Sequence, residues 1–225
     1  MGAKKNNVIK IINCISGNVL SLSTFFVHLI SERKIMNKNR LEAFSDGVLA
    51  IIITIMVLEL QIPEGDRFSD LKPLVFKFLS YIFSFLYVGI YWNNHHHLFQ
   101  AVKHVNGKVL WANLHLLFWL SILPFATSWM GENNFTKNPV AFYGFVLLMC
   151  ALAFNILQKF CLDIEGKDSV IAKALESTLK EKLSAGIYIS GIVLSFYYPI
   201  IAVVFYYTAA LLWIIPDLRI EKTLK

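Results

Sequence analysis

The stretch Arg40–Ile62, RLEAFSDGVLAIIITIMVLELQI, decides the fold expected for this chain. After Gly47 it runs through eleven uncharged, mostly branched residues before Glu59. A helix rises about 1.5 Å per residue, so Asp46 and Glu59 lie roughly 20 Å apart along it. A hydrocarbon core is about 30 Å thick, so both carboxylates are expected near the bilayer rims or facing protein or water. The stretch therefore predicts a transmembrane helix with an acidic residue toward each end.

One face of this predicted helix carries an apolar stripe. Ile51, Ile55 and Leu58 are spaced at i, i+4 and i+7, and Thr54 lies beside them. A stripe of this kind usually reflects ordinary helix packing. The spacing alone therefore leaves its role open.

The composition places the whole chain in a membrane. Of the 225 residues 56% are hydrophobic and 16% are charged, whereas soluble domains have about 25% charged residues. The net charge of +6 does not indicate nucleic-acid binding, because the basic residues are scattered in loops between apolar blocks. Cys14, Cys150 and Cys161 show no metal-ligand spacing, and their odd number predicts no disulfide framework.

The apolar blocks predict an all-α, polytopic membrane protein with six transmembrane helices, at about residues 40–62, 74–99, 109–130, 140–162, 184–198 and 199–215. Pro124 is expected to kink the third segment, and Pro199 divides the last two as a hairpin. Between the fourth and fifth segments, residues 163–183 suggest an amphipathic interfacial helix.

The distribution of basic residues predicts the orientation in the membrane. Six spans place both termini on one side, and most Lys and Arg residues lie on that side. The opposite side has only Arg67, Lys72, Lys77 and Lys137. Because positive residues accumulate in the cytoplasm, we expect both termini to be cytoplasmic, with the protein in the cell membrane.

The start of the first segment carries Arg40-x-x-x-Phe44-Ser45-Asp46-Gly47, which resembles the signature of the transmembrane protein 175 family. Further matches follow in order, at compatible distances, over residues 37–220. They are Trp92-Asn93-Asn94-His95-His96 with Leu98-Phe99, Trp111-Ala112-Asn113-Leu114, Pro124-Phe125-Ala126-Thr127 and Pro216-Asp217-Leu218-Arg219. Members of this family are potassium-permeable channels of lysosomes and, in a shorter form, of bacteria. The resemblance implies one short, single-repeat unit whose first helix forms the pore between subunits of a homo-oligomer, a tetramer by analogy.

The resemblance also implies roles for the stripe. Ile51, Ile55 and Leu58 correspond to the pore constriction, and Thr54 to a pore-lining, selectivity-related position. A ring of branched apolar side chains gates by expelling water. A helical threonine more often bonds the carbonyl four residues earlier, here that of Ala50. No backbone-carbonyl filter sequence is present, so modest selectivity is expected.

Polar residues near both ends of the stripe complete the predicted site. The resemblance implies a bracing polar network of Arg40, Phe44, Ser45, Asp46, His95 and Asn113. Six residues separate Arg40 from Asp46, so pairing them needs a helix-end bend or a neighbouring subunit. A second role of His95, in proton sensing, is left open because imidazole titrates near neutrality. Glu59 either forms a cation-attracting ring at the pore mouth, with one copy from each subunit, or is a solvated charge at the helix end.

The run His95-His96-His97 does not predict a metal site. Neighbouring helical positions point about 100° apart, so three consecutive histidines cannot close on one ion. We expect no metal, no cofactor and no enzymatic activity.

Residues 1–35 form an N-terminal extension with a basic start and a short apolar region, like a signal sequence, but no clear cleavage site follows. The stretch is also too polar for a confident span. The family resemblance begins just after Met36, which implies Met36 as the native start. The channel domain would then be residues 36–225, with potassium ions and the lipid bilayer as partners.

The alternative function is a secondary transporter of cations or small molecules. The first segment has no proline and only an early glycine, which is unlike the broken helices of transporter sites.

Overall fold

The computed structural model describes residues 38–166, 169 and 179–214. Three predicted features fall outside these residues: the extension at 1–35, most of the interfacial segment at 163–183, and the motif Pro216–Arg219.

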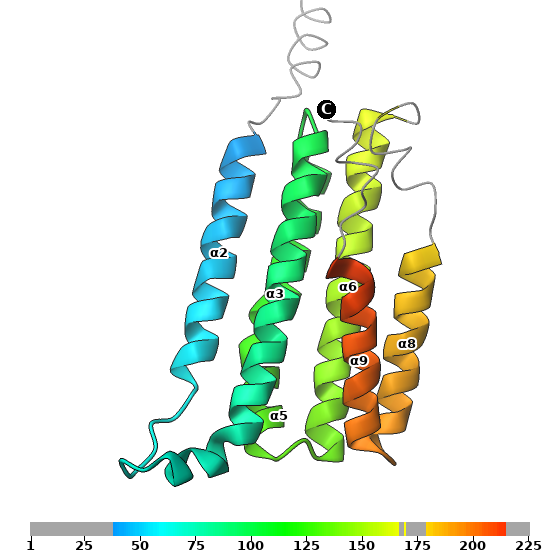
Figure 1. Ribbon diagram of the computed structural model, residues 1–225. Coiled ribbons are helices and arrows are strands. Elements are labelled where there is room, and N and C mark those ends of the chain that lie inside the picture. Colours follow the sequence, from blue (N-terminus) through cyan, green and yellow to red (C-terminus); the bar gives the residue numbers. More distant parts are fainter. Residues whose placement is uncertain (1–37, 167–168, 170–178, 215–225) are drawn as a thin grey trace, which may run out of the picture. The chain divides into compact units, whose positions relative to one another are not determined.

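The described part of the chain is helical. Its elements are α2 (Lys38–Leu58), the 3-10 helix η1 (Phe68–Leu74), α3 (Val75–Ala101), α4 (Gly107–Ser121), α5 (Leu123–Glu132), α6 (Lys137–Glu165), α8 (Leu179–Ser195) and α9 (Pro199–Ile214). The long helices lie side by side, with α5 continuing α4, and successive spans run in opposite directions, whereas η1 lies in the connection between α2 and α3 (Figure 1). Each of the six predicted segments corresponds to a helix or to a pair of consecutive helices, which confirms the all-α membrane fold.

Among the described residues, four helical stretches are long and apolar enough to cross a membrane: 38–58, 68–101, 107–132 and 137–165. The last two helices are shorter, with 17 residues in α8 and 16 in α9. At about 1.5 Å per residue each spans roughly 25 Å, a little less than a typical hydrocarbon core.

The third segment is interrupted where Pro124 predicted a kink. Helix α4 ends at Ser121 and α5 begins at Leu123, with Ile122 between them. Proline has no N–H to donate, so it is tolerated in the first turn of a helix and unfavourable inside one. Pro124 accordingly lies in the first turn of α5. The break divides the segment into two helices two residues before Pro124, close to the position where a kink was predicted.

The hairpin predicted at Pro199 is also present. The amides of Tyr197 and Tyr198 both donate to the carbonyl oxygen of Leu194, at 3.0 and 2.7 Å, and end α8. Pro199 then begins α9. The two helices pack against each other and against α6.

Helix α6 is the most buried of the candidate spans. In its most apolar window 56% of residues are buried, compared with 28% in α2. Gly144 on α6 and Gly191 on α8 let the ring of Tyr206 on α9 approach closely, because a Cβ at either position would collide with it. Tyr206 is fully buried there and donates to the carbonyl oxygen of Val140 at 3.3 Å. Helix α6 therefore lies at the centre of the packed core in the described part of the chain.

Helix α2 lies at the edge of this bundle and packs on α3, α4 and α5 (Figure 1). It does so through one stripe of buried residues: Leu41, Ser45, Leu49, Ile52 and Met56. The stripe follows the spacing of three or four residues that places side chains on one helical face. The opposite face of α2 is left uncovered by the rest of the described chain.

Candidate functional site

The uncovered face of α2 carries the residues of the predicted constriction. Ile51 is 60% exposed, Leu58 is 76% exposed, and Ile55 and Thr54 are also exposed. Ile52, the residue after Ile51, is 2% exposed and belongs to the opposite, packed face. The 3.6-residue period explains this contrast, because one step along a helix turns a side chain by about 100°. The predicted constriction residues thus share a surface that no other part of the described chain covers.

Thr54 makes the local bond that its helical position favours. Its Oγ1 donates to the carbonyl oxygen of Ala50 at 2.8 Å. This bond uses the hydroxyl proton and leaves oxygen lone pairs on the exposed side of the helix. Thr54 therefore offers an oxygen acceptor within an otherwise apolar face.

Three of the predicted network residues form a buried hydrogen-bond chain. His95 on α3 contacts Oδ1 of Asn113 on α4 through its Nε2, at 2.8 Å. The Nδ2 of Asn113 donates to Oγ of Ser45 on α2 at 2.9 Å, and Ser45 donates to the carbonyl oxygen of Leu41 at 2.9 Å. All three side chains are buried. With Asn113 Oδ1 as acceptor, His95 Nε2 must carry a proton, so the chain of donors runs from α3 through α4 to α2.

The other predicted network residues lie outside this buried chain. Asp46 is exposed and accepts a hydrogen bond from Nε1 of Trp92 on α3, at 3.0 Å. Arg40 is exposed, and no ion pair joins it to Asp46 within the described residues. Phe44 is half exposed, on the uncovered side of α2. The structure therefore divides the predicted network into a buried chain through Ser45 and a surface contact through Asp46.

Lys38 makes a contact that the sequence did not predict. Its ammonium donates to the carbonyl oxygens of Phe99 at 2.8 Å and Val102 at 2.9 Å. The last carbonyls of a helix have no partner within it and carry partial negative charge, so a cation is favourable there. Lys38 thus ties the start of α2 to the end of α3. A lysine next to the first helix is a weak signal, because nothing local identifies a partner 61 residues away.

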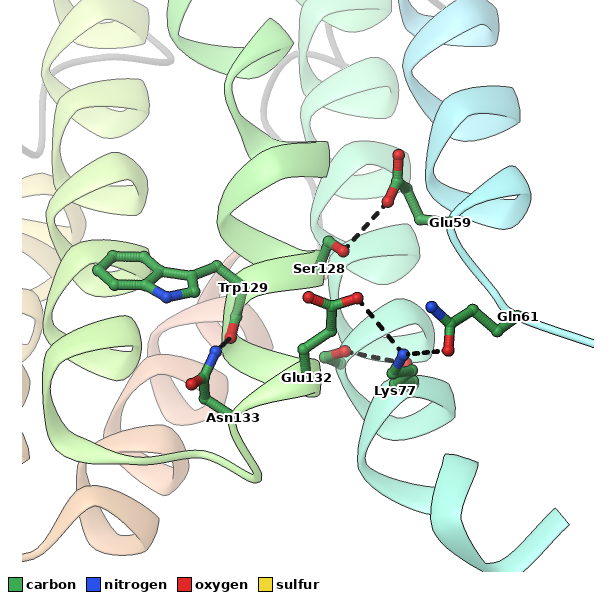
Figure 2. Close-up of polar contacts among 8 residues, drawn as sticks. Glu59, Gln61, Lys77, Ser128, Trp129, Glu132 and Asn133 are labelled. Carbon is green, nitrogen blue, oxygen red and sulfur yellow. Dashed lines mark hydrogen bonds and ion pairs between the residues drawn. The ribbon is translucent and has the colours of Figure 1, made fainter. Parts of the chain in front are cut away.

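Helix α2 has a second polar attachment at its other end (Figure 2). Ser128 on α5 donates to Oε2 of Glu59 at 3.2 Å. Beside it, Lys77 on α3 pairs with Glu132 on α5 at 3.4 Å and donates to Oε1 of Gln61 at 2.8 Å. Two carboxylates and one ammonium give this cluster a net negative charge, and it lies at the end of the uncovered face of α2.

His95 and His96, the first two of the three consecutive histidines, have different hydrogen-bond partners. His95 contacts Asn113, whereas Nε2 of His96 contacts Nε2 of Gln100 at 2.8 Å and its ring stacks on Trp92. Across residues 38–166 and 179–214, no group of three or more His, Cys, Asp or Glu side chains could hold a metal ion.

Comparison with known proteins relates this geometry to a family. A family model described as endosomal/lysosomal potassium channel TMEM175 matches residues 40–124. A protein named potassium channel from Chryseobacterium sp. (strain P1-3) is 61% identical over 190 residues, which are 84% of this chain and 99% of that protein. Another protein named potassium channel, from Streptomyces collinus, is 34% identical over 131 residues, 54% of this chain and 64% of that protein.

A solved structure has the same fold. It is described as the crystal structure of a lysosomal potassium-selective channel TMEM175 homolog from Chamaesiphon minutus, with a TM-score of 0.68 and 27% sequence identity. The match covers 79% of this chain and 96% of that one.

Proposed function

The chain belongs to the TMEM175 family, and from this premise we propose that it is a potassium-permeable channel whose conduction path is lined by the uncovered face of α2. The protein is a multi-pass membrane protein, so an uncovered apolar face meets either lipid or another protein. A single helix cannot enclose a path for ions. The pore must therefore be shared between copies of the chain, and the resemblance favours four.

The observation that carries this proposal is the contrast between the two faces of α2. One face packs on three neighbouring helices, and the other presents Ile51, Thr54 and Leu58 to no partner within residues 38–166 and 179–214. No charged side chain interrupts α2 between Asp46 and Glu59. A symmetric assembly would bring this continuous uncharged face of each copy together around one axis.

Side chains on this face would control permeation in two ways. Rings of Ile51, Ile55 and Leu58 would make a narrow apolar passage that conducts only when it is wide enough to hold water. The Thr54 oxygen, with its proton donated to Ala50, would present lone pairs to a partly dehydrated potassium ion. Both effects are consistent with passive conduction and modest selectivity.

The polar contacts would hold this face in position. The buried hydrogen-bond chain from His95 through Asn113 to Ser45 would fix the rotation of α2 about its axis. Turning the helix would leave buried donors and acceptors without hydrogen-bond partners. At the other end, Glu59 and its neighbours would raise the local cation concentration at a pore mouth. We place the basic end of the bundle in the cytoplasm and the Glu59 end outside, in the cell membrane.

The second candidate function is a secondary transporter. Transporter sites commonly use discontinuous helices whose unwound backbone coordinates the substrate. Helix α2 is continuous from Lys38 to Leu58, which favours a channel over a transporter.

Flux measurements in liposomes separate these functions. With impermeant counter-ions, a channel gives fast, voltage-driven potassium flux that does not saturate. A transporter gives a fixed coupling ratio between two solutes. Saturating, coupled flux would overturn the proposed function, and so would protein that stays monomeric in bilayers.

A further inference from the structure

A groove between α4 and α6 is lined by no residue of α2. It has a volume of about 730 Å³, and its lining includes Lys108, Trp111 and His115 on α4 and Ile156 and Phe160 on α6. Lys108, Trp111 and His115 follow the spacing of one helical face, and so do Ile156 and Phe160. Ala112 on α4 is also in the lining, and its small side chain leaves room between the two helices.

We propose that this groove binds one anionic phospholipid, with its phosphate at Lys108 and an acyl chain along Trp111, Ile156 and Phe160. Lys108 and His115 are seven residues apart, so the groove reaches roughly 10 Å along α4 from its start. That depth covers the headgroup region and the first part of the acyl chain in a bilayer. The lining is cationic at Lys108 and apolar at Ile156 and Phe160. A phospholipid changes in the same order, from its charged headgroup to its acyl chains.

The aromatic residues of the groove support a lipid occupant. Trp111 is 73% exposed although it lies on an apolar helix. Tryptophan is enriched at the level of the lipid headgroups, where its ring contacts both polar and apolar groups. Deeper along the helices, Trp119 donates to Nε2 of His115 at 3.0 Å and packs edge-on against Phe145 on α6. This contact joins the two helices below the groove and limits its depth.

The charges around the groove favour an anionic lipid over a neutral one. Lys108 and Lys159 are exposed on the two helices that form it, and Lys103 is exposed in the adjoining loop. Asp163 is exposed on α6 nearby, whereas Glu165 accepts hydrogen bonds from the amides of Lys103 and His104 at 2.7 and 3.2 Å. The lysines outnumber the exposed carboxylate. Basic grooves between membrane helices bind anionic headgroups, each lysine strengthening the attraction.

The test uses the full chain purified in a neutral detergent. Phosphatidylglycerol should raise the thermal unfolding temperature more than phosphatidylcholine with the same acyl chains, and inorganic phosphate should have no effect. Lys108→Gln should weaken the apparent affinity for phosphatidylglycerol about fivefold and leave the unfolding temperature without lipid unchanged. The matched control is Lys137→Gln, because Lys137 is an exposed lysine in the first turn of α6 at the opposite end of the bundle.

A second measurement identifies the occupant directly. The difference in tryptophan fluorescence between the wild type and Trp111→Phe is the emission of Trp111. Phosphatidylglycerol with brominated acyl chains should quench this emission. Three results would overturn the proposal: equal effects of Lys108→Gln and Lys137→Gln, equal stabilisation by the two lipids, or no quenching of Trp111. The last would mean that something other than lipid, such as a second copy, covers the groove. None of these results depends on ion conduction, so the proposed channel function is tested separately.

Discussion

Asn113 on α4 donates a hydrogen bond to Ser45 on α2 across 2.9 Å, and both side chains are buried. Asn113 also accepts from His95 on α3, so a single amide connects three helices. An amide is suited to this position because it donates and accepts at once. Rotation or sliding of α2 would break the contact.

Ser45→Ala removes the acceptor for Asn113. Because the amide proton would then be buried without a partner, we expect the free energy of unfolding to fall by about 1–3 kcal/mol, with less assembled protein. Chemical denaturation of the purified protein measures the change. The control Ser121→Ala removes an exposed hydroxyl that donates to the carbonyl oxygen of Phe118, and it should change stability by less than about 0.5 kcal/mol. Equal effects of the two substitutions would argue against a buried network that positions α2.

Ile51→Asn and Ile52→Asn place the same amide on opposite faces of α2. Ile52 is buried, so Ile52→Asn should destabilise the protein by about 1–3 kcal/mol without increasing conduction. Ile51→Asn should hardly change stability, because the amide meets water in the open pore. It should raise resting potassium flux and reduce discrimination among cations. Flux and unfolding measured on both variants decide the pore face, and an Ile51→Asn protein that unfolds without gaining flux would refute it.

Asp46→Ala removes the exposed hydrogen bond with Trp92. Because the carboxylate is solvated, we expect a loss of at most about 1 kcal/mol and a normal yield of oligomer. Size-exclusion chromatography and thermal unfolding measure these quantities. A collapse of assembly would mean that Asp46 becomes buried against another copy of the chain.

Lys38→Gln tests the tie between α2 and the end of α3. Loss of the cation from the last carbonyls of α3 should cost about 1 kcal/mol and speed amide hydrogen exchange near Val102. The side chain of Lys103 is exposed, so Lys103→Gln is the control and should leave exchange unchanged. Unchanged exchange in Lys38→Gln as well would show that this contact does not hold the helix end.

Glu59→Gln should lower potassium conductance at low ionic strength, and the difference should vanish at high salt. Glu64→Gln, which neutralises an exposed acid in the following loop, should have a smaller effect. Single-channel currents over a range of salt concentrations measure both. A loss of conductance that persists at high salt would indicate a structural role for the bond with Ser128.

Sequence reasoning predicted the helical architecture because apolar length and proline are local signals. The division at Pro124 and the hairpin at Pro199 both followed from them. Partners distant in the sequence were harder to predict. Asp46 suggested a pairing with Arg40, whereas in the structure it contacts Trp92, which lies 46 residues away. The contact of Lys38 with Phe99 was not predicted at all, since its geometry arises only after α2 has packed on α3.

The two faces of α2 have a consequence for how such a protein can diverge. Residues that secure the helix, such as Ile52 and Met56, are not those that face outward, such as Ile51 and Leu58. Substitutions on the outward face therefore incur little folding penalty, so this face can vary while the packed face stays the same. One inherited scaffold can thus supply channels with different ion preferences, provided that each new outward side chain still suits a helix.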